Sequence, residues 1–120
     1  MAVSNYQNLN VWQKAMDLAV EIYNLVRKLP KEELFSLSNQ MRRAAVSIPS
    51  NIAEGNGRQT EGEFQHFLRI AKGSAAELET QLLICKKIGY VAPTDINLAM
   101  DLLTEISKMI TALMKKRQIV

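Results

Sequence analysis

Only a few residues of this 120-residue chain have types and spacings that could support chemistry. Glu63 and His66 have the Glu-x-x-His spacing that places two metal ligands on one face of a helix in di-iron bundles. Such a site needs a second pair, and the chain has one histidine. Cys85 lies 19 residues from His66, about 28 Å along a helix, too far for a nucleophile and its base. We therefore expect no metal, no cofactor and no enzymatic activity.

The glycine-rich segment at Gly55, Asn56 and Gly57 could in principle bind phosphate. However, no strand precedes it and no Gly-Lys-Ser/Thr follows, as a phosphate-binding loop would require. Acidic residues at Glu61 and Glu63 would also repel an anion there. The segment is predicted to connect two helices, with Gly55 ending the first of them.

The elements that must position these residues are helices. Pro30, the glycine-rich segment and the stretch from Gly89 to Pro93 divide the chain into four parts, each with apolar residues at steps of three and four. The predicted helices span about 11–29, 38–54, 61–88 and 95–116. Short connections between long helices favour antiparallel neighbours. We expect one all-α domain over residues 1–120, an up-down-up-down four-helix bundle.

Local signals refine these helices. Asn10 is the predicted N-cap of the first helix, and Thr60 with Glu63 forms a capping box for the third. Gly73, which stands among small residues, predicts a close approach of another helix. The first helix carries two adjacent apolar seams, which together form a stripe wider than one bundle interior covers. The second seam is formed by Trp12, Met16, Ala19, Tyr23 and Val26.

A polar stripe runs along the second helix and faces a matching set on the third. We interpret it as a hydrogen-bonded layer between helices or subunits, formed by Arg43, Ser47, Asn51, Glu54, Glu77 and Gln81. Adjacent residues diverge by about 100° around a helix. We therefore expect Arg43 inside, held by Glu54, Glu77 or Glu79, and Arg42 on the surface. Phosphate binding by both arginines is the alternative.

Charge is distributed unevenly along the predicted bundle. The chain has a net charge of +3, but one end collects seven Lys and Arg residues against three Asp and Glu residues, a net of +4. Such a field attracts polyanions, although basic residues also favour helix C-termini for local reasons. Most aromatic rings fall on packed seams, so few remain to stack on bases. The predicted nucleic-acid contacts are Arg27, Lys28, Lys31, Arg42, Lys86 and Lys87.

The run QMRRAAVSIPSNIAEG at residues 40–55 resembles the signature of the four-helix-bundle 23S rRNA intervening-sequence protein family. The resemblance spans essentially the whole chain, and further matches lie at Glu63-Phe64, Phe67-Leu68, Ala71, Gly73-Ser74, Glu77-Leu78-Glu79 and the opening Leu9-x-Val-Trp-Gln-Lys-Ala. Members carry the label "S23 ribosomal protein". A related bundle, the accessory protein of diversity-generating retroelements, forms a five-fold barrel and binds nucleic acid. The resemblance implies a homopentamer with a nucleic-acid contact, and it supplies no enzymatic activity.

Together these observations predict a non-enzymatic, homo-oligomeric module that binds RNA or DNA without strong sequence selectivity. The alternative is a protein–protein interaction scaffold that does not bind nucleic acid. No apolar run approaches the length of about 18 residues that a membrane span needs, and the chain opens without the pattern of a signal peptide. We expect a cytoplasmic location, no membrane contact and no small-molecule substrate.

Overall fold

The computed structural model describes the backbone of residues 5–118 and the side chains of residues 5–116. Within this range all regular structure is helical, with no strand. The long helices are α1 (Asn10–Val26), α2 (Leu37–Asn56), α3 (Glu61–Ile88) and α4 (Asn97–Gln118). Short 3-10 helices at Tyr6–Asn8, Lys31–Glu33 and Pro93–Ile96 precede α1, α2 and α4. This confirms the predicted all-α class with four long helices, whereas the ends of the predicted 1–120 domain lie outside the described residues.

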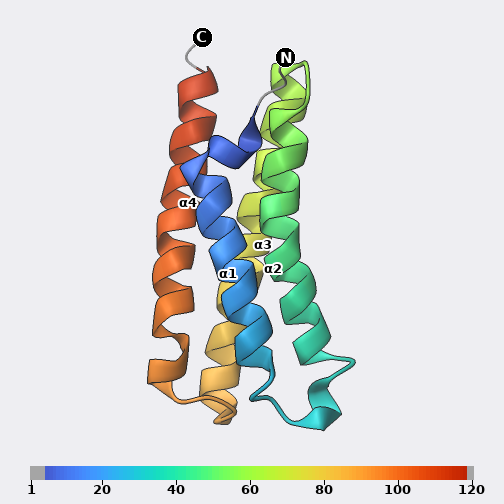
Figure 1. Ribbon diagram of the computed structural model, residues 1–120, viewed down its shortest axis with the longest axis vertical. Helices are drawn as coiled ribbons and strands as arrows, with labels where there is room; N and C mark the ends of the chain where they lie inside the picture. Colours follow the sequence, from blue (N-terminus) through green and yellow to red (C-terminus); the bar gives the residue numbers. More distant parts are fainter. Residues whose placement is uncertain (1–4, 119–120) are drawn as a thin grey trace.

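The four long helices lie side by side along a molecule of 46 × 22 × 21 Å (Figure 1). Helix α1 packs against α2 and α4, and α3 packs against the same two helices. The sequence colours run down α1, up α2, down α3 and up α4 (Figure 1). The α1–α2 and α3–α4 loops therefore lie at one end of the molecule, here called the basic end, and the α2–α3 loop lies at the other.

One apolar core fills the space between the helices, and its large, fully buried members include Leu18, Ile22, Ile48, Phe64, Leu78 and Ile106. Each helix contributes residues at the predicted steps of three and four. None of the described helices is long and apolar enough to cross a membrane.

The ends of α3 follow the local signals. The Thr60 hydroxyl accepts a hydrogen bond from the Glu63 backbone N–H at 3.2 Å, so the predicted cap is present. Gly89 has φ +93°, the left-handed conformation that glycine adopts easily. Helix α1 differs from its prediction: Leu9, not Asn10, precedes its first turn, with no side-chain cap. It ends at Val26, because the backbone N–H groups that follow bond to carbonyls three residues back, as Leu29 does to Val26.

The two glycine predictions are wrong. Helix α2 continues through Gly55 to Asn56, and Gly55 is buried against α3. A Cβ on Gly55 would lie 3.0 Å from the Phe67 Cβ and 3.4 Å from the Phe64 carbonyl oxygen, so this glycine permits the close approach of α2 and α3. Gly73 does not, because it lies on the exposed face of α3 and a Cβ there would have no neighbour within 4 Å.

Candidate nucleic-acid interface

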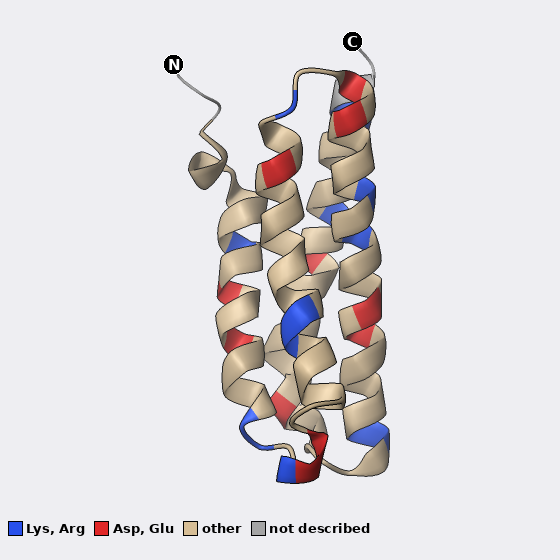
Figure 2. Cartoon of the chain, turned by 90° about the vertical axis from the view of Figure 1, so that its right-hand side faces the viewer, with Lys and Arg blue, Asp and Glu red and all other residues tan. Residues whose placement is uncertain are grey.

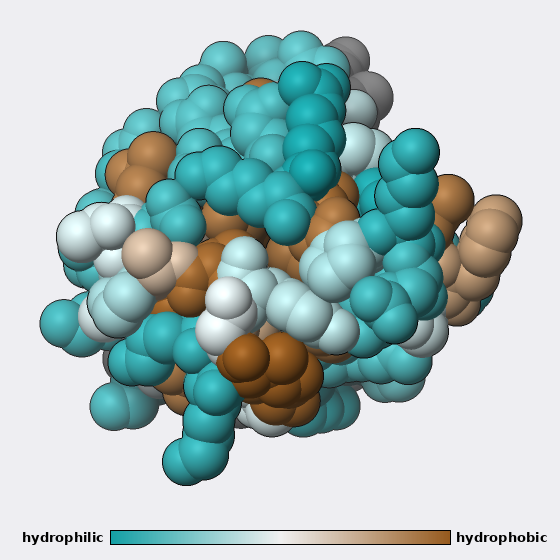
Figure 3. Space-filling view, turned by 90° about the horizontal axis from the view of Figure 1, so that it is seen from below, coloured by the Kyte–Doolittle hydropathy of each residue, from teal (hydrophilic) through white to brown (hydrophobic). Residues whose placement is uncertain are grey.

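The fold brings all six predicted nucleic-acid contacts to the basic end. Arg27 and Lys28 directly follow α1, Lys31 begins the 3-10 helix of the α1–α2 loop, and Arg42 lies in the second turn of α2. Lys86 and Lys87 form the last turn of α3. Basic segments lie at the lower ends of α1 and α3, with acidic segments close to the α1–α2 loop (Figure 2). Seen from below, hydrophilic side chains cover most of this end, with apolar atoms between them (Figure 3).

The six residues differ in whether their charge is already paired. The Lys28 ammonium lies 2.8 Å from the Asp95 carboxylate, and this hydrogen bond, with one from the Ala92 backbone N–H, lowers the pKa of Asp95. Arg42 donates to the Leu34 carbonyl at 3.4 Å. The other four side chains are exposed, and none forms an ion pair or hydrogen bond within the described part of the chain: Arg27, Lys31, Lys86 and Lys87.

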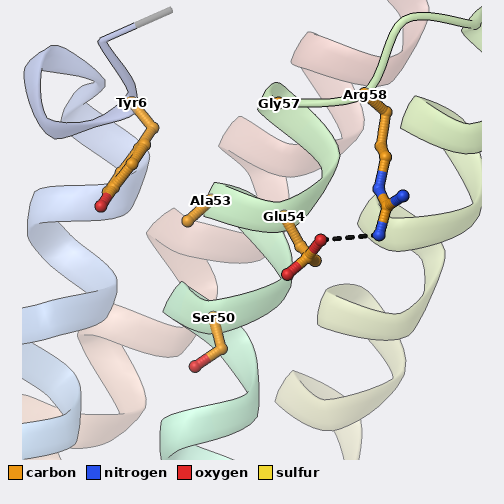
Figure 4. A pocket seen from close by; sticks show the side chains of 6 residues that line it. All are labelled: Tyr6, Ser50, Ala53, Glu54, Gly57 and Arg58. Atoms are coloured by element: carbon orange, nitrogen blue, oxygen red, sulfur yellow. Dashed lines mark hydrogen bonds and ion pairs between the residues drawn. The ribbon is translucent and has the colours of Figure 1, made fainter. Parts of the chain in front are cut away.

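One cation at the opposite end of the molecule, Arg58, is paired. The Arg58 guanidinium lies 2.7 Å from Glu54 and 3.8 Å from Glu63, and it stacks over the Phe67 ring at 4.8 Å. Arg58 and Glu54 border a hollow of about 450 Å³ between the α2–α3 corner and Tyr6, and the dashed line in Figure 4 marks their ion pair. Glu54 was predicted for the polar layer, and the structure instead pairs it with Arg58, about 16 Å along α2 from Arg43.

Part of the predicted polar layer forms a hydrogen-bonded group between α2 and α3. The Ser47 and Ser74 hydroxyls are 2.8 Å apart, and the Asn51 amide donates to the Ser47 carbonyl at 2.8 Å and to its hydroxyl at 3.0 Å. On the same side of α3, the Gln81 amide donates to Glu77 at 3.5 Å. Ser74, which is 8% exposed, was missed. Its position seven residues before Gln81 places both on one face and could have identified it.

The structure contradicts the predicted role of Arg43, whereas Arg42 makes an exposed contact at the surface, as predicted. Arg43 is exposed and forms no ion pair within the described residues, so it is not held by Glu54, Glu77 or Glu79. It lies two residues after the fully buried Met41, about 200° around the helix, and so points away from the core. Arg42 is about 100° from Met41 and reaches the α1–α2 loop. Arg43 borders a hollow of about 330 Å³ between α2 and α3.

The second apolar seam of α1 is only partly covered. Met16 is 41% exposed and Tyr23 is 45% exposed, whereas Val26 at the end of the seam is buried. A hollow of about 360 Å³ separates this seam from Val46 and Pro49 of α2. The described chain alone therefore leaves an apolar groove between α1 and α2.

Hydrogen bonds to Glu33 hold the α1–α2 loop in place. Its carboxylate accepts hydrogen bonds from the Ser36 hydroxyl and the Tyr90 hydroxyl, both at 2.7 Å. The hydrogen bond from Ser36, and to a lesser extent that from Tyr90, lowers the pKa of Glu33. The Tyr90–Glu33 hydrogen bond in turn raises the pKa of Tyr90. The next residues in this loop are apolar and exposed: Leu34 is 45% exposed and Phe35 is 90% exposed. Phe35 is thus one of the few rings that the sequence leaves free, since it lies on none of the predicted seams.

Comparison with known proteins identifies the family. Residues 7–112 match the 23S rRNA-intervening sequence protein family. A solved structure of a protein of unknown function from the S23 ribosomal protein family of Bacteroides thetaiotaomicron is similar, with a TM-score of 0.81 and 30% sequence identity. The similarity covers 88% of this chain and 98% of that one. No curated protein matches the chain. With its matching fold and a family match over most of its length, the chain belongs to the 23S rRNA-intervening sequence protein family.

Proposed function

We propose that the protein is a non-enzymatic, self-assembling helical module that binds RNA or DNA through phosphate contacts at the basic end. The observation that carries this proposal is the group of four exposed cations without ion-pair partners, Arg27, Lys31, Lys86 and Lys87. An approaching phosphate meets these groups without displacing a carboxylate, and it releases the counterions condensed on the nucleic acid. Binding of this kind reads charge rather than sequence, which gives weak sequence selectivity.

Two further points support a nucleic-acid ligand. The family takes its name from an intervening sequence of 23S rRNA, which supports RNA as the first polymer to test. Arg43, exposed on α2, extends the set of available cations up one side of the molecule. Lys28 and Arg42 contribute less in this arrangement, because Asp95 and the Leu34 carbonyl already engage them.

The proposed assembly is a homopentamer of up-down-up-down bundles arranged as a five-fold barrel in the cytoplasm. The apolar groove between α1 and α2 supports self-association, because burying exposed apolar surface drives assembly. Val20 at 62% exposure, Tyr23 at 45% and Val46 at 43% contribute such surface. A ring with its basic ends on one face would carry a charge of about +20 there, five times the +4 of one chain, and would multiply weak contacts.

The second candidate function is a protein-interaction scaffold that docks a different partner in the same groove. It is favoured by the apolar lining, with Trp12, Met16, Val46 and Pro49 around about 360 Å³. This reading assigns the groove to another protein and leaves the basic end without a ligand, so the two candidates differ in what they predict for nucleic acid.

Titration of fluorescently labelled RNA and DNA with the purified full chain, followed by anisotropy at several salt concentrations, tests the proposal. We expect binding that weakens steeply with salt and differs little between unrelated sequences. Absence of binding at about 50 mM salt, where phosphate contacts are strongest, would refute it. Light scattering tests the assembly: five copies of the 13.5 kDa chain weigh about 67.5 kDa, and a stable monomer would contradict the pentamer.

A further inference from the structure

One aromatic ring at the basic end is fully presented to solvent. Phe35 is 90% exposed, more than any other large apolar side chain in the described range. By contrast, Phe64 is buried in the core, and Trp12 and Phe67 are partly buried. Leaving such a ring in water forgoes the stabilisation that its burial would provide. The exposure of Phe35 therefore has no explanation in the packing of the single chain.

The loop that carries this ring is held in place. Besides the Ser36 and Tyr90 hydrogen bonds to Glu33, the backbone N–H groups of Leu34 and Ser36 donate to the Lys31 and Glu33 carbonyls, both at 3.0 Å. Because these contacts fix the backbone on both sides of Phe35, a ligand of the ring does not have to order the loop.

Two cations lie on or against the loop that carries Phe35. The Arg42 guanidinium is 3.4 Å from the carbonyl oxygen of Leu34, the residue before Phe35, and Lys31 opens the same loop. Glu32 and Glu33 are the opposing charges, and the Glu33 carboxylate keeps its charge while it accepts hydrogen bonds from two hydroxyls. Proteins hold single-stranded nucleic acid with this combination: bases stack on exposed rings and cations follow the phosphates. In a duplex the base faces are already stacked and unavailable to a ring.

We propose that Phe35 stacks on an unpaired base, so that the basic end binds single-stranded RNA or DNA in preference to a duplex. This inference rests on the proposed nucleic-acid function and specifies its ligand class. It agrees with weak sequence selectivity, because every base offers a π-face to a ring. Because Phe35 carries no charge, its contribution to affinity can be measured separately from that of the phosphate contacts.

The test measures the affinity of a labelled single strand of about 12 nucleotides, within the usual site size, and of a duplex of equal length. The Phe35→Ala variant should bind the single strand about 5- to 150-fold more weakly, as expected for loss of one base–ring stack. Its duplex affinity and the salt slope for both ligands should not change. Phe35→Trp should retain single-strand binding. Its new indole, followed in a Trp12→Phe background, should lose fluorescence when the strand is added.

A matched control alters charge beside the ring. Glu32→Gln removes one of the two carboxylates of this loop, and it should strengthen binding of single strand and duplex alike. If wild type binds both ligands and Phe35→Ala weakens neither, or weakens both equally, stacking is excluded while the proposed function stands. If wild type binds neither ligand, the proposed function fails and the inference with it. If Phe35→Ala lowers the assembly mass in light scattering, the ring contacts protein instead, and the inference is overturned.

Discussion

Neutralising the last turn of α3 tests where phosphate binds. Lys86 and Lys87 are exposed there, and neither side chain has a polar partner within the described residues. Changing both to glutamine keeps side chains that favour a helix and removes two positive charges. Each lysine interacts favourably with the helix C-terminus by about 0.3–1 kcal/mol, so the free energy of unfolding should fall by less than about 2 kcal/mol. The double variant should remain folded.

The expected effect on binding follows from the number of contacts. Each neutralised phosphate adds about 0.7 to the slope of log affinity against log salt for a single strand and about 0.9 for a duplex. Loss of both Lys86 and Lys87 contacts in one engaged subunit therefore lowers the slope by about 1.4 to 1.8. Between about 50 and 200 mM salt, wild-type affinity should fall about 7- to 12-fold more than that of the double variant.

Fluorescence anisotropy over this salt range measures both slopes, and circular dichroism with light scattering checks fold and assembly. The matched control changes Lys115 and Lys116, two exposed lysines near the end of α4, to glutamine. It alters the net charge equally but at the opposite end of the molecule. A control that reduces the slope as much as the test variant would show that net charge alone governs binding. An unchanged slope in the Lys86 and Lys87 variant, with an intact oligomer, would refute the basic-end site.

Three further predictions concern stability and assembly. Gly73→Ala should raise the free energy of unfolding by up to about 1 kcal/mol, because alanine is the better helix former and its Cβ meets open space. Gly55→Ala should lower the free energy of unfolding by about 1–3 kcal/mol, because its Cβ would press against Phe67. Urea titrations that rank the two variants the other way would contradict the close packing of α2 on α3 at Gly55. Tyr90→Phe should destabilise the protein at neutral pH but less so at pH 3. The hydrogen bonds that lower the pKa of Glu33 contribute stability that is lost as the pH falls through that pKa and the carboxylate is protonated. An equal loss of stability at both pH values would exclude the Tyr90–Glu33 hydrogen bond as the cause. Val20→Glu should leave the helical circular dichroism intact and dissociate the assembly in light scattering, and a wild-type mass would remove Val20 from the interface.

Local signals in the sequence predict α3 over the same residues as the structure, because Thr60 and Gly89 fix its two ends by their own chemistry. The end of α1 shows where periodicity fails. Leu29 keeps the apolar spacing and is 7% exposed, yet its backbone N–H bonds three residues back rather than four. Burial thus continues beyond the helix, so a pattern of buried residues cannot report the change in hydrogen bonding.

The grouping of the basic residues follows from topology alone, whereas their pairing depends on distances that no spacing reports. Lys28 pairs with Asp95, which is 67 residues away in the sequence, and Arg42 donates a hydrogen bond to a carbonyl of the neighbouring loop. The position of Arg43 could not be predicted from the sequence either, because the spacing of Gln40, Arg43 and Ser47 along the polar stripe is equally compatible with a buried layer and an open groove. Only the positions of neighbouring side chains decide between them.

Pairing distinguishes the α2–α3 corner from the last turn of α3 as a contact for an anion. At the α2–α3 corner a phosphate would compete with the Glu54 carboxylate, which lies 2.7 Å from the Arg58 guanidinium, four residues later in the chain. It would also meet a second carboxylate, Glu63, which lies 3.8 Å from Arg58. Displacing an ion pair removes one charge-assisted hydrogen bond for each one formed. At the last turn of α3 the phosphate replaces only water and counterions around Lys86 and Lys87, and the counterions it releases favour binding at low salt. A phosphate should therefore bind more weakly at the α2–α3 corner than at the last turn of α3.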